Sequence, residues 1–314
     1  MILVTGASGL VGHEIVKRIP SDNLCIINRS ALKFETDAKV FNLNISPAAD
    51  YTVALESINC IIHCAAMVHS FKNISEDSFN AVNLYGTMNL AKQAVKAGVK
   101  RFIFISTIKV NGESTIVDLP FSCYNSRKPK DFYAKSKSKA EEQLLQLADQ
   151  TGLEVVIIRT STLVYGAGVK ANFASLMKLV SKGLPLPFGL VNSNKRSLVS
   201  VSNLVDLIVT CIEHPKAKNQ VFLVSDDHDV STSEMVSEMS IACGKNNFQL
   251  PVPVWCYKFI GKLLKKEDFV DCLIGSLQVD ISHTKETLDW TPPQSLRNGF
   301  KETSDYILST QGKK

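Results

Sequence analysis

Residues 1–12 read MILVTGASGLVG, and this stretch decides the fold. Its second to fourth residues form a short apolar run without charge, which is typical of a buried strand in a parallel sheet. Glycines then recur at every third position, and apolar residues follow at helical spacing: Gly6, Gly9 and Gly12, then Leu10, Val11, Ile15, Val16 and Ile19. The stretch therefore predicts a strand, a glycine turn and a helix.

The glycine turn indicates a binding site for a diphosphate. Side chains at these positions would hold the backbone away from the phosphates, and the start of the next helix offers free N–H groups and a positive dipole end. The same glycine pattern also occurs in tight turns that only pack a helix on a strand. The candidate dinucleotide contacts of this turn are Gly6, Ser8, Gly9, Leu10, Val11 and Gly12.

Strand-like and helix-like segments alternate along the first 224 residues. Apolar runs predict strands at residues 24–27, 39–44, 60–66, 101–105, 153–159, 196–201 and 221–224. Helices are predicted at residues 80–96, 133–148, 173–181, 203–213, 231–243, 254–265 and 299–308. This alternation predicts an α/β fold, a Rossmann-type doubly wound parallel sheet with a smaller C-terminal substrate-binding lobe. We expect residues 1–164 with 196–225 to form the NAD(P)-binding domain, and residues 165–195 with 226–314 to form the lobe.

Composition narrows the class of protein. The chain has 314 residues, 45% of them hydrophobic and 21% charged, as in ordinary globular proteins. Its net charge of +5, without a dense basic block, does not indicate a nucleic-acid partner.

Eight cysteines and six histidines show no metal-ligand spacing, so we expect no metal site and reduced thiols in the cytoplasm. The first strand begins at once, which argues against a signal peptide, and no apolar run reaches the roughly 18 residues of an integral membrane segment.

The ends of three further strands predict the rest of the dinucleotide site. The second strand ends in Asn28 and Arg29, without the acid that would bond the 2′-hydroxyl of NAD. Arg29 can instead bind a 2′-phosphate, so NADP(H) is favoured and NAD(H) is the alternative; Arg29 could also be a solvated loop arginine. His63, on the fourth strand, is interpreted as a packed residue. The other candidate cofactor contacts are Asn44, Ile45, Ala65 and Ala66.

Tyr133 and Lys137 are four residues apart on a predicted helix, so their side chains share one face. A free tyrosine has a pKa of about 10, and a lysine ammonium one turn away is expected to lower this pKa. Lys137 can also bond the nicotinamide ribose, which makes both residues cofactor contacts. Thr107, at the end of the fifth strand, can hold a substrate oxygen against Tyr133. The three residues are the candidate catalytic group of a carbonyl reduction.

Together, the glycine turn, Thr107 and Tyr133-x-x-x-Lys137 resemble the extended short-chain dehydrogenases/reductases, and within them the NAD-dependent epimerase/dehydratase family. The resemblance covers the whole chain, including residues 159–166 (RTSTLVYG), 196–203 and 288–296. It implies a UDP-linked sugar substrate and a homodimer. The sequence departs from the family's usual residues at Asn28, Asn44, Thr107 and Asn203, which bears on the cofactor more than on the chemistry.

The resemblance also implies the substrate contacts. It places Arg196 where the family holds the nucleotide diphosphate, and a guanidinium can pair with a diphosphate through two bonds. A structural arginine at a strand edge is the alternative. Tyr165 either lines the sugar site or packs in the core. The candidate substrate-binding residues are Thr107, Lys109, Asn172 and Arg196.

Three functions remain open on the sequence alone. Residues 104–112 (FISTIKVNG) and 203–207 resemble reductases of the 4-keto group of UDP-2-acetamido-2,6-dideoxy-hexos-4-uloses in surface polysaccharide (O-antigen) synthesis, and we favour this function. A UDP-sugar 4-epimerase of the UDP-glucose or UDP-N-acetylglucosamine type, with bound NAD, shares every motif. A non-catalytic dinucleotide sensor or scaffold would not need Tyr133 and Lys137. A 4,6-dehydratase is not expected, because Ile108 and Lys109 stand where it needs an Asp-Glu pair.

Residues 254–266 read VWCYKFIGKLLKK and combine an apolar helical face with lysines. We expect this face to pack on the core of the lobe. A contact with a membrane surface is the alternative.

Overall fold

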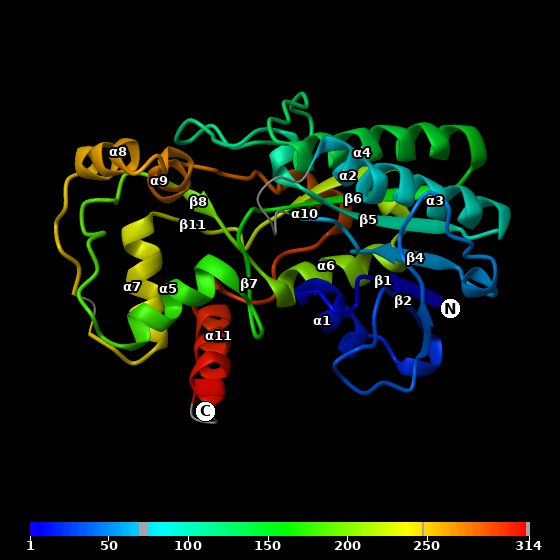
Figure 1. Cartoon of the computed structure of the whole chain (residues 1–314), viewed down its shortest axis with the longest axis horizontal. Coiled ribbons are helices and arrows are strands. Elements are labelled where there is room, and N and C mark those ends of the chain that lie inside the picture. Colours follow the sequence, from blue (N-terminus) through cyan, green and yellow to red (C-terminus); the bar gives the residue numbers. More distant parts are fainter. Residues whose placement is uncertain (69–74, 247, 312–314) are drawn as a thin grey trace.

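The computed structural model describes residues 1–68, 75–246 and 248–311 and centres on one parallel sheet (Figure 1). Seven strands pair in the order β10-β6-β5-β4-β1-β2-β3, so the predicted doubly wound α/β fold is confirmed. The strands are β1 (Ile2–Thr5), β2 (Leu24–Asn28), β3 (Lys39–Asn42), β4 (Cys60–His63), β5 (Arg101–Thr107), β6 (Glu154–Thr160) and β10 (Gln220–Val224).

Strand β1 lies at the point where the strand order reverses. All four of its residues are buried, and it pairs in parallel with β2 on one side and β4 on the other, with Ile2 opposite both Leu24 and Cys60. In open α/β sheets, ligands bind in the crevice at the carboxyl ends of such strands. The glycine turn that follows β1 therefore stands at the crevice of this sheet.

Helices cover both faces of the sheet (Figure 1). On one face, α3 and α4 pack together; on the other, α1 packs against α6. The helices are α1 (Leu10–Arg18), α2 (Glu76–Phe79), α3 (Thr87–Lys96), α4 (Phe132–Thr151), α5 (Ala171–Ser181), α6 (Val201–Glu213), α7 (Thr232–Ala242), α8 (Val254–Leu263), α9 (Glu267–Ile274), α10 (Ser282–Leu288) and α11 (Leu296–Gln311). None of the described helices is long and apolar enough to cross a membrane.

A separate apolar cluster joins α5, α7 and α11 beside the sheet. The rings of Tyr165, Phe173 and Phe300 pack against one another at its centre, with centroids 4.8–5.6 Å apart. Helix α10 packs on the sheet and not in this cluster. Leu288 lies in the core of the sheet, and Thr284 donates a 2.7 Å hydrogen bond to the Leu223 carbonyl of β10. The chain thus returns to the sheet between α9 and α11, and the predicted division at residue 226 stays a prediction.

The helix predicted at residues 80–96 begins earlier and is irregular. It consists of α2, a π-helix at Asn80–Gly86, and α3. A π-helix advances more residues per turn than an α-helix, so it shifts the phase of the side chains. Helical spacing over residues 80–96 predicts an apolar stripe that includes Tyr85, but Tyr85 is 53% exposed, so this part of the prediction is wrong.

Other boundaries also differ. The strand predicted at residues 196–201 is two short strands, β8 (Arg196–Ser197) and β9 (Val199–Ser200), which pair with β11 (Asp229–Val230) and β7 (Val164–Tyr165). The apolar face of α8 does not pack on the core, contrary to our expectation. Only Gly261 of this helix is buried.

Candidate active site

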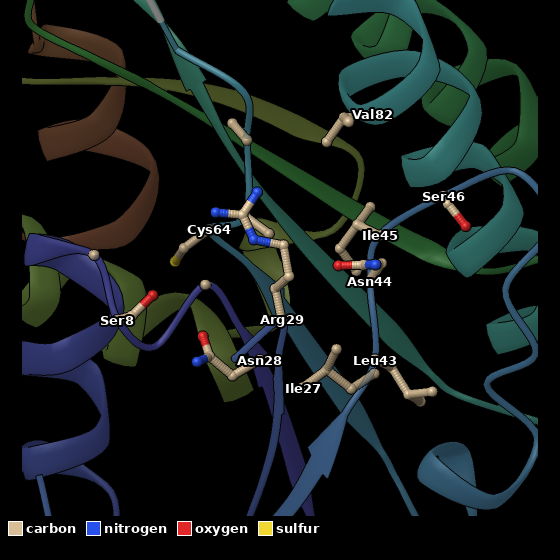
Figure 2. Close-up of a pocket in the computed structure, with 14 residues that line it drawn as sticks. Ser8, Ile27, Asn28, Arg29, Leu43, Asn44, Ile45, Ser46, Cys64 and Val82 are labelled. Atoms are coloured by element: carbon tan, nitrogen blue, oxygen red, sulfur yellow. The ribbon is translucent and has the colours of Figure 1, made fainter. Parts of the chain in front are cut away.

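A cavity of about 490 Å³ opens at the carboxyl ends of β1, β2, β3 and β4. Figure 2 shows Ser8 on the glycine turn, Asn28 at the end of β2 with Arg29 after it, and Asn44 to Ser46 after β3. The candidate cofactor contacts that do not line the cavity are Leu10, Val11 and Gly12, on α1, and Tyr133 and Lys137, on α4. The candidates that line the cavity are Gly6, Ser8, Gly9, Asn28, Arg29, Asn44, Ile45, Ala65 and Ala66.

The glycine turn leaves no room for side chains. Gly6 has a φ of +75°, and a Cβ there would lie 2.7 Å from the Ala65 nitrogen. A Cβ on Gly12 would lie 2.3 Å from the Gly6 carbonyl oxygen. Gly9 precedes α1 without any side-chain cap, so the first N–H groups of the helix are left for a ligand. This cradle fits the diphosphate of a dinucleotide.

A buried chain of hydrogen bonds supports the turn from behind. His63 is fully buried, with Nδ1 2.8 Å from Thr5 Oγ1 and Nε2 3.0 Å from Thr87 Oγ1. Thr5 Oγ1 also accepts a 3.2 Å hydrogen bond from the Ala65 N–H. Burial, with the nearby Lys137, lowers the pKa of His63 to about 3. His63 is therefore a neutral, packed residue. Through Thr5 it helps to fix the end of β1 and the segment of Ala65 after β4, which both border the cavity.

The side of the cavity formed by the residues that follow β3 was only partly predicted. Buried Tyr51 donates to the Asn44 carbonyl at 2.9 Å and accepts from the Ser46 N–H at 3.1 Å, which fixes the loop between them. Asn28 turns its amide to the Ser30 carbonyl, whereas Arg29 is exposed at the cavity. Residue spacing in the sequence could not identify Tyr51, because its role depends on hydrogen bonds to a loop that folds against it. The cavity-lining residues that sequence reasoning missed are Ile27, Leu43, Ser46, Cys64 and Val82.

The candidate catalytic residues come from two neighbouring elements. Tyr133 and Lys137 lie in the first two turns of α4, which begins where the Asp131 carboxylate accepts a 2.6 Å hydrogen bond from the Ala134 N–H. Thr107 is buried at the end of β5, against which α4 packs. Lys137 is 1% exposed, and its Nζ lies 3.7 Å from the centroid of the Phe104 ring.

Burial moves the pKa values of this pair in opposite directions. It lowers the pKa of Lys137 to about 7, against the opposing influence of Glu141 and Cys64. It raises the pKa of Tyr133 to about 12, and the nearby Asp131 carboxylate adds to this rise. Our expectation that Lys137 lowers the pKa of Tyr133 is therefore wrong for this structure. Loss of solvation is the largest cause of both shifts, and for Tyr133 the nearby charge that acts is the carboxylate of Asp131.

A buried ion pair holds this region together and was not predicted. Glu141 has no exposed surface and accepts a 2.6 Å hydrogen bond from Nη2 of Arg159, on β6. Ser106 donates to the same carboxylate at 2.5 Å, and Arg159 Nη1 donates to Asn111 at 3.0 Å. Glu141 lies one turn beyond Lys137 on α4. The network therefore fixes the helix that carries Tyr133 and Lys137 against β5 and β6.

Two of the candidate substrate contacts, Lys109 and Arg196, have partners within the chain. Lys109 Nζ lies 2.8 Å from the Asp131 carboxylate. Arg196 is buried on β8 and donates to the Gly275 carbonyl at 3.1 Å and to that of Cys272. Asn172 is exposed at the start of α5. The roles of these residues towards a substrate stay predictions.

Tyr165 is buried in the packed rings and donates a 2.6 Å hydrogen bond to Asp226. Asp226 also accepts from the Ser200 N–H at 2.8 Å and from the Asn203 amide at 2.7 Å. Of the two interpretations of Tyr165, the structure shows the packing one.

Residues 2–225 match the profile of the family described as the NAD dependent epimerase/dehydratase family. The chain belongs to this family. It is 54% identical to a UDP-glucose 4-epimerase of Vibrio cholerae over 99% of this chain and 97% of that protein. The membership confirms the resemblance and makes the chain an enzyme of the short-chain dehydrogenase/reductase type.

Solved structures share the fold over nearly the whole chain. The UDP-glucose 4-epimerase of Thermotoga maritima with UDP-glucose is 22% identical, with a TM-score of 0.79 and 99% of both chains covered. The UDP-glucuronic acid 4-epimerase of Bacillus cereus in complex with NAD is 20% identical, with a TM-score of 0.76, covering 98% of this chain and 99% of that one. These likenesses establish that the family fold extends through the C-terminal lobe.

Replacement of Tyr133 tests the proton-transfer group. Tyr133→Phe removes the phenolic hydroxyl and should lower turnover by roughly 10² to 10⁴, the usual effect of a positioned proton donor. Dinucleotide affinity, measured by titration, should change little. Tyr306→Phe, on the outer part of α11, is the matched control. Turnover of Tyr133→Phe within about threefold of the wild type would refute the assignment.

Replacement of Lys137 tests its buried charge. The pKa of Lys137 is lower in the folded chain than the ordinary 10.5, so the unfolded chain binds more protons between about pH 7 and pH 10. The stability of the cofactor-free protein should therefore rise with pH across this window. Lys137→Met removes this dependence and should raise the melting temperature most at pH 7 and below. Exposed Lys92→Met should shift the melting temperature equally at every pH, and a pH-independent difference for Lys137→Met would contradict a lowered pKa.

Proposed function

We propose that this enzyme is a UDP-sugar 4-epimerase of the UDP-glucose type. One observation carries the proposal: Thr107 ends β5 at the sheet edge that also holds the glycine turn, Tyr133 and Lys137 open the helix packed on β5, and the chain is 54% identical to a UDP-glucose 4-epimerase. Epimerisation at carbon 4 needs a group that takes a proton from the 4-hydroxyl and returns it, and a cofactor that takes and returns a hydride. When bound, NAD would supply that reversible hydride acceptance.

The residues divide the remaining work. The Tyr133 hydroxyl moves the proton at the oxygen on carbon 4, and Lys137 stands one turn further along the same helix, in reach of the nicotinamide ribose. Thr107 orients the same oxygen from the end of β5. Gly6, Gly9 and Gly12 hold the diphosphate of the dinucleotide against the start of α1. The Glu141–Arg159 ion pair holds α4, which carries Tyr133 and Lys137, against β6.

The ketoreductase that we favoured on sequence becomes the second candidate. Residues 104–112 favour reduction of a 4-keto UDP-sugar for surface polysaccharide, but the V. cholerae relative, 54% identical to this chain, carries the name of a 4-epimerase. A non-catalytic sensor is the least supported, because it would need neither Tyr133, which is half-buried, nor Lys137, which is buried on the same helix. All eight cysteines are free thiols, which supports a cytoplasmic location. The homodimer implied by the family resemblance is likewise a proposal.

We propose NAD(H) as the resident cofactor, in place of the NADP(H) favoured by the sequence. An epimerase recycles one hydride and gains from a tightly held dinucleotide, and the B. cereus epimerase is in complex with NAD. Arg29 is the feature that supports NADP(H), since it stands exposed at the cavity.

Titration with both cofactors tests this choice. NADH should bind at least as tightly as NADPH, and Arg29→Ala should leave NADH affinity almost unchanged. A loss of NADPH affinity by one to two decades in Arg29→Ala, about the 1.5–3 kcal/mol of a charge-assisted hydrogen bond, would favour NADP(H) if NADPH also binds the wild type more tightly.

Two incubations separate the two enzymes. The protein without added cofactor should convert UDP-glucose, or UDP-N-acetylglucosamine, into its carbon-4 epimer, detected by NMR. With a UDP-4-keto-6-deoxy sugar and NADPH, absorbance at the NADPH band should stay constant. NADPH consumption in the second mixture without epimer in the first would support the ketoreductase and refute the epimerase. Tyr133→Phe is the inactive control for both mixtures.

A further inference from the structure

Helix α8 presents an apolar stripe to solvent. Trp255, Phe259 and Leu263 follow one another at intervals of four residues, and they are 68%, 64% and 71% exposed. Ile260 and Leu264 beside the stripe are 50% and 60% exposed. Single exposed apolar residues are ordinary, but contiguous exposed patches mark interaction sites.

The opposite side of the helix holds it in place. Gly261 is the buried residue of α8, and a Cβ there would lie 2.8 Å from Cγ2 of Val270, on α9. The Tyr257 ring stacks on Phe188 with centroids 6.3 Å apart. The orientation of α8 is therefore fixed by packing, and the stripe (Trp255, Phe259 and Leu263) faces away from its contacts.

Lysines border the stripe. Lys258 and Lys262 lie one turn apart along its edge, and Lys265 and Lys266 follow the helix; all four are exposed. Residues 244–266 contain five lysines and no aspartate or glutamate. In the sequence, acidic residues return with α9, at positions 267, 268 and 271. The charged residues of α8 itself are therefore all basic.

More apolar surface adjoins the helix in the chain. Phe248 and Leu250 are 64% and 41% exposed in the segment that leads to α8. The Leu250 N–H donates to the Leu186 carbonyl at 2.8 Å, which joins this segment to that of Leu184 and Leu190, also exposed. In Figure 1, α8 lies at the end of the molecule opposite β1 and β2, well away from the cavity of Figure 2.

We propose that α8 docks the protein on an anionic lipid bilayer. An amphipathic helix with lysines beside a stripe of Trp, Phe and Leu lies in the bilayer interface, with its apolar side among the acyl chains and its lysines at the phosphates. Tryptophan favours this interfacial depth. The contact is peripheral, because α8 has ten residues.

Charge favours a bilayer over a second copy of the chain. A two-fold contact through α8 would place the same patch against itself, so the lysine rim would meet another lysine rim. Like charges across an interface oppose association. An anionic membrane instead offers both an apolar interior and a negative rim.

Vesicle flotation tests the proposal with the intact protein. Binding is expected to vesicles of phosphatidylglycerol and phosphatidylcholine, to weaken with salt, and to be weak on phosphatidylcholine alone. Lys258→Glu with Lys262→Glu should weaken binding by more than about tenfold, at ~1 kcal/mol for each lysine near the surface. Lys92→Glu with Lys96→Glu, equally spaced and exposed on α3, is the control and should bind like the wild type.

Tryptophan fluorescence reports which helix enters the bilayer. Of the two tryptophans, Trp255 is exposed, whereas Trp290 is 5% exposed and donates to Asp206. The wild type should show a blue shift with anionic vesicles, and Trp255→Phe should show none. Trp255→Ser with Phe259→Ser and Leu263→Ser should lose flotation while keeping its melting temperature and turnover.

Three results would overturn the proposal. They are no flotation of the wild type, equal flotation of the triple variant, or a wild-type dimer in sedimentation that the triple variant loses while neither binds vesicles. The last result would assign the stripe to a second copy. Because flotation needs no substrate, its outcome is independent of whether the enzyme proves to be an epimerase.

Discussion

The burial of Lys137 is the constraint around which the site is arranged. An ammonium group with 1% exposed surface is poorly solvated, so its pKa falls to about 7, and the protein compensates with the Phe104 ring face and the Glu141 carboxylate. Glu141 can be buried in turn only because Arg159 and Ser106 donate to it. The same lysine helps to keep His63 neutral, which suits the bonds of His63 to two threonine hydroxyls.

This arrangement leaves Tyr133 and Lys137 with less charge near neutral pH than a solvated pair would carry. Tyr133, with a pKa of about 12, keeps its proton, and Lys137 is close to half protonated. Two neighbouring groups with pKa values displaced in opposite directions are typical of acid–base sites. Close packing of Gly6 against the Ala65 backbone, and of Gly12 against the Gly6 backbone, shapes the phosphate cradle at the same edge of the sheet. The buried lysine and the closely packed glycines therefore both lie at the carboxyl edge of the sheet.

Local patterns predicted the fold and most of the cradle, because strand runs, glycine spacing and the Tyr-x-x-x-Lys interval act over a few residues. The rest depends on contacts between distant parts of the chain. Glu141 and Arg159 lie on different elements, Tyr51 acts through a loop, and the π-helix changes the face on which Tyr85 lies. Helical spacing placed Lys137 near Tyr133, but it could not show that desolvation would dominate both pKa values.

Helix α8 shows why an apolar pattern does not determine what a helix contacts. The core of the lobe is completed by α5, α7 and α11, whose rings of Phe173 and Phe300 pack with Tyr165. After this packing, Gly261 against Val270 and Tyr257 on Phe188 hold α8 in place, while Trp255, Phe259 and Leu263 stay exposed. Exposed apolar area adds nothing to the stability of the folded monomer and raises the risk of association. The stripe and its lysine rim are therefore explained by a contact outside the monomer, not by folding.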